Sequence, residues 1–450
     1  MDKESSRERA LSLILRILRD GAYYQEAVEE GLSDGVFDAR DRAFILLLVR
    51  GVIEKKTALD AVLSRISQVR PEEMDLRIRG ILYLGLYQIL YTDTAPYAAV
   101  NESIALLHGR KEQGLTGYVN AVLRRASREK DALLSALPRS VRAGIPDAIF
   151  KVWKEGYGTE KALSVSEAFA RPLVNGQCIR LNLSKGSAEM LLAALEADGV
   201  FAVPSGFSKD TYFTRDSNLA ETESFQEGLF YIQDLGSALI TESLRTILEK
   251  AEEDFFVLDA CASPGGKTIH TADLLAGKGR ILSADLTQDK LIRLDENIIR
   301  SGFQNIRTEL KDATVQDPAL IAEADLVIAD LPCSGLGTLR EKPDIRLRFT
   351  RDKRTALVKL QRTILENLSA YVKPGGLLLY STCTLDPEEN EHQYQDFLSR
   401  HPEFKPEKIE LQDSRLVKPE MERGYLTLFP DEIPGGGFFV SLMRKTGREA

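Results

Sequence analysis

The 450-residue sequence predicts a multi-domain chain: an all-α domain over 1–132, connecting helices and a small α+β domain over 133–237, and an α/β domain over 238–450. Three observations lead to this division. Apolar residues recur at helical spacing in the first part, strand-like runs appear in the second, and strands alternate with helices in the third. Such alternation is typical of a parallel, doubly wound sheet.

The first part of the chain contains only helical patterns. Leu11, Ile14 and Leu18 recur at three- and four-residue spacing, which marks the apolar side of an amphipathic helix. Segments 41–55 and 78–91 are apolar on most sides and are expected to form core helices. A further helix is expected over 118–125. It ends in basic residues, which are also consistent with complementing its C-terminal dipole.

The sequence changes character after about residue 175. Segments 178–182 and 229–233 read as strands, with a helix over 187–198 between them, which predicts the small α+β domain. The C-terminal domain is then expected to contain strands at 255–258, 281–284, 305–310, 326–329, 376–381 and 437–443, and helices at 267–276, 288–301, 353–372 and 388–400.

Composition limits the class of protein. A hydrophobic fraction of 43% and a charged fraction of 28% indicate an ordered globular chain. The longest apolar stretches fall short of the roughly 18 residues that a membrane helix needs. The N-terminus lacks a signal-peptide pattern, so we expect a cytoplasmic protein without membrane contact. Four cysteines without CxxC pairs predict free thiols and no metal site.

The distribution of charge is uneven. The net charge of −9 argues against a general nucleic-acid binder, but basic residues outnumber acidic ones over 101–180 and over 340–362. Each basic stretch has two interpretations. It is either a solvated helix surface or a surface that follows the phosphates of a nucleic acid.

A glycine-rich turn follows the first strand of the α/β domain. The segment 259–268 reads DACASPGGKT, and a turn of this kind brings the backbone close to a ligand. It is not GxGxxG, which disfavours a dinucleotide site, and a P-loop would need glycine in place of Cys261. The turn predicts cofactor contacts from Cys261, Ala262, Ser263, Pro264, Gly265, Gly266 and Lys267.

Acidic residues follow the next three strands. Asp285 ends the second strand, Asp312 follows the third and Asp330 ends the fourth. An acid after the second strand hydrogen-bonds the ribose of a nucleoside cofactor. Each aspartate alone is equally consistent with a helix N-cap or a turn. Together, after a glycine turn, they predict S-adenosylmethionine and the layout of its methyltransferases.

Two cysteines occupy equivalent positions after apolar strands. Cys333 lies in DLPCSG at 330–335, and Cys383 lies in STCT at 381–384. Ligands of open α/β sheets bind at the carboxyl ends of the strands, so both thiols are expected to face one substrate. Either cysteine alone is equally consistent with an inert buried thiol.

These motifs resemble those of the RNA cytosine-5 methyltransferases of the Sun type. The resemblance rests on CASPGGK at 261–267, the two cysteine motifs, PEENE at 387–391 and GGGFFV at 435–440. The helical N-terminus resembles the NusB fold, and the middle domain resembles the family's RRM-like insert. The pairing resembles that of the bacterial members that act on small-subunit (16S) rRNA. A Rossmann-like class I methyltransferase domain is therefore expected at the C-terminus.

The resemblance also implies a mechanism. Cys383 corresponds to the nucleophile that adds to C6 of cytosine, so that C5 becomes able to accept a methyl group. Cys333 corresponds to the cysteine that assists product release. Asp330 corresponds to the aspartate that holds the cytosine edge and contacts the cofactor. Lys267 is either an electrostatic aid or a surface lysine.

The implied partner is RNA. A cytosine must leave its stack to reach such a site, so a single-stranded or hairpin-loop substrate is expected. Glu341 stands where the family carries a cation, which puts the RNA contacts of that loop in question. A monomer is expected. The alternatives are a non-catalytic NusB-like RNA-binding scaffold with a degenerate methyltransferase domain, and a P-loop nucleotidase.

Overall fold

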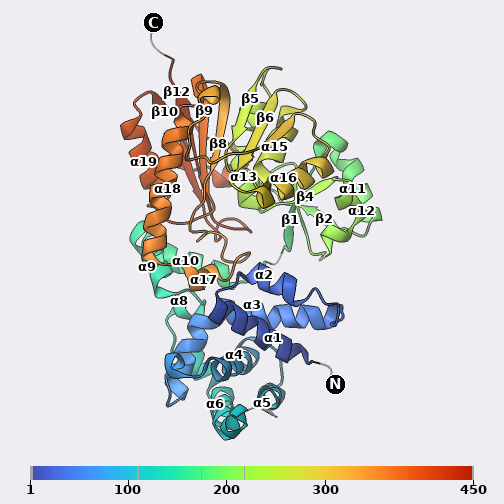
Figure 1. Ribbon diagram of the computed structural model, residues 1–450, viewed down its shortest axis with the longest axis vertical. Helices are drawn as coiled ribbons and strands as arrows, with labels where there is room; N and C mark the ends of the chain where they lie inside the picture. The colour runs from blue at the N-terminus through green and yellow to red at the C-terminus, as the bar shows by residue number, and fades with distance from the viewer. Residues whose placement is uncertain (1–3, 109–110, 174, 217, 448–450) are drawn as a thin grey trace. The chain divides into compact units, whose positions relative to one another are not determined.

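The computed structural model describes residues 4–108, 111–173, 175–216 and 218–447, and they cluster into two compact units (Figure 1). The first unit comprises residues 1–171 and 339–349, and the second comprises 172–338 and 350–450. The α+β segment therefore groups with the C-terminal sheet rather than standing alone. The helices after residue 132 group with the N-terminal helices. Among the described residues, no helix is long and apolar enough to cross a membrane.

Helices are the only regular elements among the described residues of the first unit, as predicted for the N-terminal part. Helix α4 (Leu76–Tyr91) is buried along almost its whole length because its residues are apolar on every side. The other helices are α1 (Ser6–Leu15), α2 (Tyr24–Gly31), α3 (Ala39–Ile66), α5 (Pro96–Ala105), α6 (Thr116–Arg128), α7 (Lys130–Ser135), α8 (Arg139–Arg142), α9 (Asp147–Tyr157), α10 (Thr159–Ala170) and α17 (Ile345–Arg348).

The basic segment after Leu339 corrects one expectation from the sequence. Arg340 and Arg346 were candidates for a surface that follows phosphates, but they are only 7% and 6% exposed within the helical unit. Arg346 Nη1 donates to the carbonyl of Leu339 at 2.6 Å, and Arg340 donates to the carbonyl of Ala168. Burial and hydrogen bonds to backbone carbonyls use these guanidinium groups, so they are not free for RNA.

The second unit begins with a small antiparallel sheet in the order β2-β3-β1-β4. The sequence predicted two of its strands and its main helix but not β2 and β3, which are only three and four residues long. The elements are β1 (Gln177–Leu181), α11 (Ala188–Ala197), β2 (Ala202–Pro204), β3 (Thr211–Thr214), α12 (Glu223–Gln226) and β4 (Phe230–Ile232).

Both faces of the central strands β1 and β3 of this small sheet are covered. Ile179, Tyr212 and Phe230 pack under α11, whereas Cys178 and Phe213 share a core with the large sheet. The small sheet is therefore packed on the large one through one face of β1 and β3.

The large sheet has the order β10-β12-β9-β8-β5-β6-β7, with β11 paired to β12. Neighbours from β9 to β7 are parallel, and β12 runs antiparallel to β9. The strands are β5 (Phe256–Asp259), β6 (Arg280–Asp285), β7 (Ile306–Leu310), β8 (Ala324–Asp330), β9 (Val372–Thr382), β10 (Phe404–Pro406), β11 (Tyr425–Leu428) and β12 (Phe438–Lys445). All six predicted strands are present, and the sequence did not predict β10 and β11.

Helices cover both faces of the sheet (Figure 1). One layer contains α13 (Leu235–Glu242), α14 (Arg245–Leu248), α15 (Gly266–Leu275) and α16 (Gln288–Ser301), and the other contains α18 (Arg351–Ser369) and α19 (Glu391–Arg400). The central strands are buried on both sides and are therefore almost continuously apolar. The order of the strands reverses between β5 and β8, and a crevice for ligands forms at such a reversal.

Candidate functional site

The glycine turn joins β5 to α15 at this reversal. Gly265 has φ 104°, and a Cβ atom there would lie 2.7 Å from Leu294 Cδ1, so both conformation and space require glycine. The Ala262 N–H donates to the Ala284 carbonyl at 2.9 Å. The Ser263 N–H donates to Asp285 Oδ2 at 3.0 Å. The predicted cofactor turn is thus tied to the end of β6.

Asp285 is buried beneath this turn. Besides the Ser263 N–H, its carboxylate accepts the Leu286 N–H at 2.7 Å and Lys290 Nζ at 2.9 Å. These donors fix the carboxylate at the carboxyl end of β6, where the sequence placed the ribose-binding acid.

Asp312 lies further out than the other predicted acids. Its exposed carboxylate accepts the N–H and the hydroxyl of Thr314 at 2.8 and 2.6 Å, and these bonds lower the pKa of Asp312. Together with Ala260 and Ala284 it lines a cavity of about 250 Å³.

Cys261 in the glycine turn is half-buried, and burial raises its pKa far above that of a free thiol.

Lys267 and Asp330 connect the glycine turn to the first thiol strand. Lys267 Nζ lies 2.7 Å from Asp330 Oδ2, and the Ser381 hydroxyl donates to Asp330 Oδ1 at 2.8 Å. Burial opposes the charge on Lys267, but the Asp330 carboxylate outweighs it and raises the pKa of Lys267. Lys267 is therefore not the surface lysine that the sequence left open. It is 8% exposed and paired with a predicted catalytic residue.

The two thiols meet beside this pair. Cys333 Sγ and Cys383 Sγ are 3.4 Å apart, at the carboxyl ends of the neighbouring strands β8 and β9. The contact with Cys383 and burial together raise the pKa of Cys333 well above that of a free thiol. The expectation that both thiols face one site agrees with this geometry.

Backbone contacts hold the two thiol segments together. The Gly337 N–H donates to the Cys383 carbonyl at 3.0 Å, and the Gly437 N–H donates to the Gly337 carbonyl at 2.7 Å. A Cβ atom on Gly337 would lie 1.8 Å from the Gly437 carbonyl oxygen, so only glycine allows this approach. The Ser334 and Thr384 hydroxyls are 2.7 Å apart. This packing makes the two motifs one structural unit.

Several residues of the site received no role from sequence reasoning. Ser381 binds Asp330, and Ser237 on α13 accepts a hydrogen bond from Lys267 at 3.3 Å. Glu389 accepts the Ser334 N–H, and Asn390 accepts the Thr382 hydroxyl. The PEENE motif was a visible signal for these last two. Nothing local marks Ser237 or Gln361, because their importance depends on tertiary contacts.

The chemistry of these residues fits S-adenosylmethionine. Gly265 and Gly266 carry no side chain, so the backbone of the turn is open to close approach by a ligand at the end of β5. Asp285 and Asp330 supply anionic groups at two strand ends, and Asp312 lines the cavity that Ala260 and Ala284 also line. The residues that would hold the cofactor are therefore the turn 261–267, Asp285, Asp312 and Asp330.

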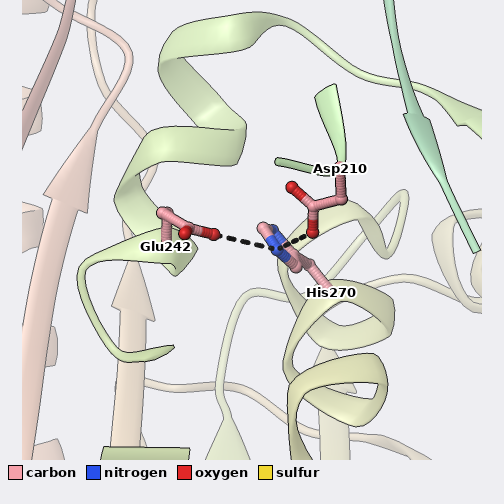
Figure 2. Close-up of side chains that lie close together, drawn as sticks. All are labelled: Asp210, Glu242 and His270. Atoms are coloured by element: carbon pink, nitrogen blue, oxygen red, sulfur yellow. Dashed lines mark ion pairs between the residues drawn. The ribbon is translucent and has the colours of Figure 1, made fainter. Parts of the chain in front are cut away.

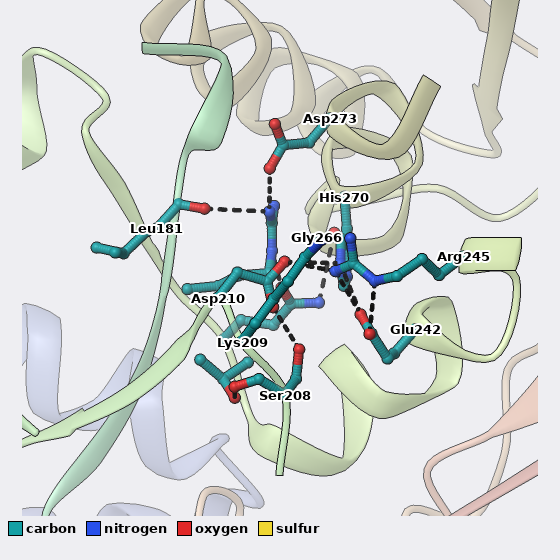
Figure 3. A network of polar contacts seen from close by, with 12 residues as sticks. Leu181, Ser208, Lys209, Asp210, Glu242, Arg245, Gly266, His270 and Asp273 are labelled. Atoms are coloured by element: carbon teal, nitrogen blue, oxygen red, sulfur yellow. Dashed lines mark hydrogen bonds and ion pairs between the residues drawn. The ribbon is translucent and has the colours of Figure 1, made fainter. Parts of the chain in front are cut away.

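A second polar cluster lies behind the glycine turn. Asp210, Glu242 and His270 offer metal-ligating atoms within 4.8 Å of one another (Figure 2). Arg245 already pairs with both carboxylates, with Nη2 at 3.0 Å from Asp210 Oδ2 and Nε at 2.6 Å from Glu242 Oε1 (Figure 3). Burial lowers the pKa of His270 to about 4, so its ring is neutral. The cluster acts as an ionic brace between the small domain, α13 and α15.

Comparison with known proteins agrees with this site. Residues 245–444 match the family model described as 16S rRNA methyltransferase RsmB/F, and residues 4–128 match the NusB family. The chain is 31% identical to the probable ribosomal RNA small subunit methyltransferase B of Bacillus subtilis (strain 168), over 99% of this chain and 100% of that protein. A relative from Pasteurella multocida, ribosomal RNA small subunit methyltransferase B, is 28% identical over 98% of this chain and 96% of its own length.

Solved structures give the same result for the fold. The crystal structure of PH0851 superposes with a TM-score of 0.76 at 26% identity, covering 97% of this chain and 98% of that one. The predicted NusB-like N-terminal domain and methyltransferase C-terminal domain are confirmed. The chain belongs to the RsmB/F family of 16S rRNA methyltransferases and is an S-adenosylmethionine-dependent RNA methyltransferase with a NusB-family domain at its N-terminus.

Proposed function

We propose that this enzyme methylates C5 of a cytosine in 16S rRNA through a covalent adduct between Cys383 and C6 of the base. The observation that carries the proposal is the 3.4 Å separation of the Cys333 and Cys383 sulfur atoms at adjacent strand ends. A methyltransferase acting on an oxygen or an exocyclic amine needs no thiol at its centre. C5 of cytosine is different, because it becomes nucleophilic only after a nucleophile such as a thiolate adds at C6.

The steps on the chain follow from the two thiols. The Cys383 thiolate forms an S–C6 bond, and the ring electrons move toward C5. S-adenosylmethionine, when bound, supplies the methyl group that C5 receives. A base then takes the C5 proton, the C5–H electron pair forms the C5–C6 double bond, the S–C6 bond breaks, and Cys383 leaves as thiolate. Cys333 assists this last step.

Asp330 orients the cytosine base, and Lys267 links Asp330 to the cofactor turn. Asp330 accepts hydrogen bonds from Lys267 and Ser381, so its carboxylate has a fixed orientation at the end of β8. A carboxylate held in this way favours a protonated N3 on the cytosine while the thiolate adds to C6. The Lys267 charge is close enough to offset the negative charge of Asp330.

The proposal is tested with unmodified 16S rRNA, S-adenosylmethionine and three proteins: the parent, Cys383→Ala and Cys333→Ala. Methyl transfer and a denaturing gel are read together. The parent is expected to methylate C5, Cys383→Ala to transfer nothing, and Cys333→Ala to accumulate a slow-migrating protein–RNA adduct. Full activity in Cys383→Ala would contradict the nucleophile assignment. RNA binding without methylation by the parent would favour the non-catalytic scaffold.

A further inference from the structure

Adjacent residues after the second thiol motif contact different thiol segments. Glu389 bonds to the segment around Cys333, and Asn390 bonds to the segment around Cys383. Both side chains are completely buried. Neither residue contacts the cofactor turn through a bond among the described residues, so the bonds to the thiol segments carry the argument.

Glu389 holds the backbone on both sides of Cys333 through hydrogen bonds. Its Oε2 accepts the Ser334 N–H at 2.9 Å and Gln361 Nε2 at 2.8 Å. The same Gln361 Nε2 lies 2.9 Å from the Pro332 carbonyl oxygen. Glu389 thus holds the residue after Cys333 directly and the residue before it through Gln361 on α18.

Asn390 makes the corresponding contacts around Cys383. Its Oδ1 accepts the Thr382 hydroxyl at 2.6 Å, and its Nδ2 donates to the Thr384 carbonyl at 2.9 Å. These are the residues immediately before and after Cys383. The Tyr380 hydroxyl, on the same strand, donates to the Glu389 carbonyl and fixes the backbone from which both side chains extend.

We propose that Glu389 and Asn390 are positioning residues with separate tasks in the proposed reaction. Asn390 orients Cys383 for addition to C6, and Glu389, acting with Gln361, orients Cys333 for release of the product. The inference rests on the proposed function, because it assumes that the two thiols act at different steps. The sulfur atoms are only 3.4 Å apart, so a small shift of one segment changes which sulfur faces the base.

The two tasks are separable by measuring formation and decay of the protein–RNA adduct. Glu389→Leu and Gln361→Met remove the contacts around Cys333 while keeping side-chain volume, and Asn390→Leu does the same around Cys383. Glu389→Gln keeps an acceptor oxygen for the Ser334 N–H and is the conservative rescue. Glu388→Leu is the matched control, because Glu388 is half-exposed and its ion pair is with exposed His392.

A misplacement of about 1 Å costs about 100-fold in a catalytic step. Glu389→Leu and Gln361→Met are therefore expected to form the adduct at close to the parental rate and to release it about 100-fold more slowly. Asn390→Leu is expected to slow formation by a similar factor and to accumulate no adduct. Glu389→Gln and Glu388→Leu are expected to behave as the parent does.

The controls separate failure of this inference from failure of the proposed function. If Cys333→Ala accumulates no adduct, the thiol roles in the proposed function are wrong. If it does, but Glu389→Leu and Gln361→Met slow formation and release equally, the separate tasks are refuted. Thermal unfolding and cofactor affinity of each variant identify a folding defect, and Gln361→Met carries the test should Glu389→Leu fail to fold.

Discussion

At the scale of single residues, two carboxyl groups of the catalytic unit are unusual. Asp259 and Glu389 are buried, and each has one oxygen without a hydrogen-bond partner among the residues that the structure describes. Burial raises the pKa of each to about 7. A carboxylate in such surroundings loses its hydration without full compensation, so its neutral form is favoured.

For Asp259 this shift predicts a pH dependence of stability. The pKa rises from about 3.9 in the unfolded chain to about 7 in the folded one. The folded state therefore holds more protons between these values, and stability falls as pH rises from about 4 to about 7. Each pKa unit corresponds to about 1.36 kcal/mol, so a shift of about three units lowers the free energy of unfolding by about 4 kcal/mol.

Asp259→Asn tests this expectation, because the amide oxygen still accepts the Thr268 hydroxyl that now lies 2.6 Å from Asp259 Oδ2. We expect the variant to be more stable than the parent at pH 8 and similar at pH 4.5. Urea unfolding of both proteins at the two pH values provides the measurement. Equal stability at pH 8 would mean that Asp259 ionises normally.

At the scale of elements, helix α15 is the support of the site. The cofactor turn precedes it, and its opposite side is braced by the small domain. Arg180 on β1 is completely buried, with Nη1 at 2.8 Å from Asp273 Oδ2 on α15 and Nε at 3.1 Å from Gln233 Oε1. The small domain therefore fixes the position of the helix that carries the cofactor turn.

Breaking the Arg180–Asp273 pair should be costly. Removing one partner of a buried ion pair costs about 3–5 kcal/mol, because the other charge stays buried and unpaired. Arg180→Met and Asp273→Leu should each destabilise the unit by such an amount, and the double variant should recover much of the loss. Calorimetry measures these losses in the unfolding transition of the second unit. That transition is the one that shifts when S-adenosylmethionine is added, since a bound ligand stabilises only the folded unit. Additive losses would exclude a direct interaction.

At the scale of the whole molecule, charge placement matters more than net charge. The chain carries −9, and part of its basic content is used internally. Arg346 is buried, and burial lowers its pKa to about 10. Arg351, Lys353 and Lys359 in the first half of α18 are exposed. The basic stretch 340–362 thus divides into a structural half and an exposed half.

This division predicts which residues contribute to the salt dependence of RNA binding. Each phosphate contact with single-stranded RNA adds about 0.7 to the slope of log affinity against log salt. Replacing Arg351, Lys353 and Lys359 together with alanine should lower the slope by about 2. Arg346→Met should change stability and leave the slope unaltered. RNA-binding titrations between about 50 and 200 mM salt measure the slope. An unchanged slope in the triple variant would exclude this surface from RNA binding.

The parts of the site that could be predicted are those marked by short sequence motifs. The glycine turn, the acids after the strands and the two cysteine motifs were all identifiable because each is a short run beside an apolar strand. The two short strands β2 and β3 were missed because three or four residues cannot show a period of two clearly. Gln361 was missed because it lies within a basic helix, and only folding brings it to the Pro332 carbonyl.

The sequence alone determined the order of the main helices and strands, the strand ends that carry chemistry and the family, since periodicity and motifs are properties of neighbouring residues. Tertiary structure decided the rest. It alone placed the Cys333 and Cys383 sulfur atoms 3.4 Å apart and buried Arg340 and Arg346. It also gave Glu389 and Asn390 their separate partners. The physical reason is that burial and pairing depend on packing between distant segments, which no local pattern records.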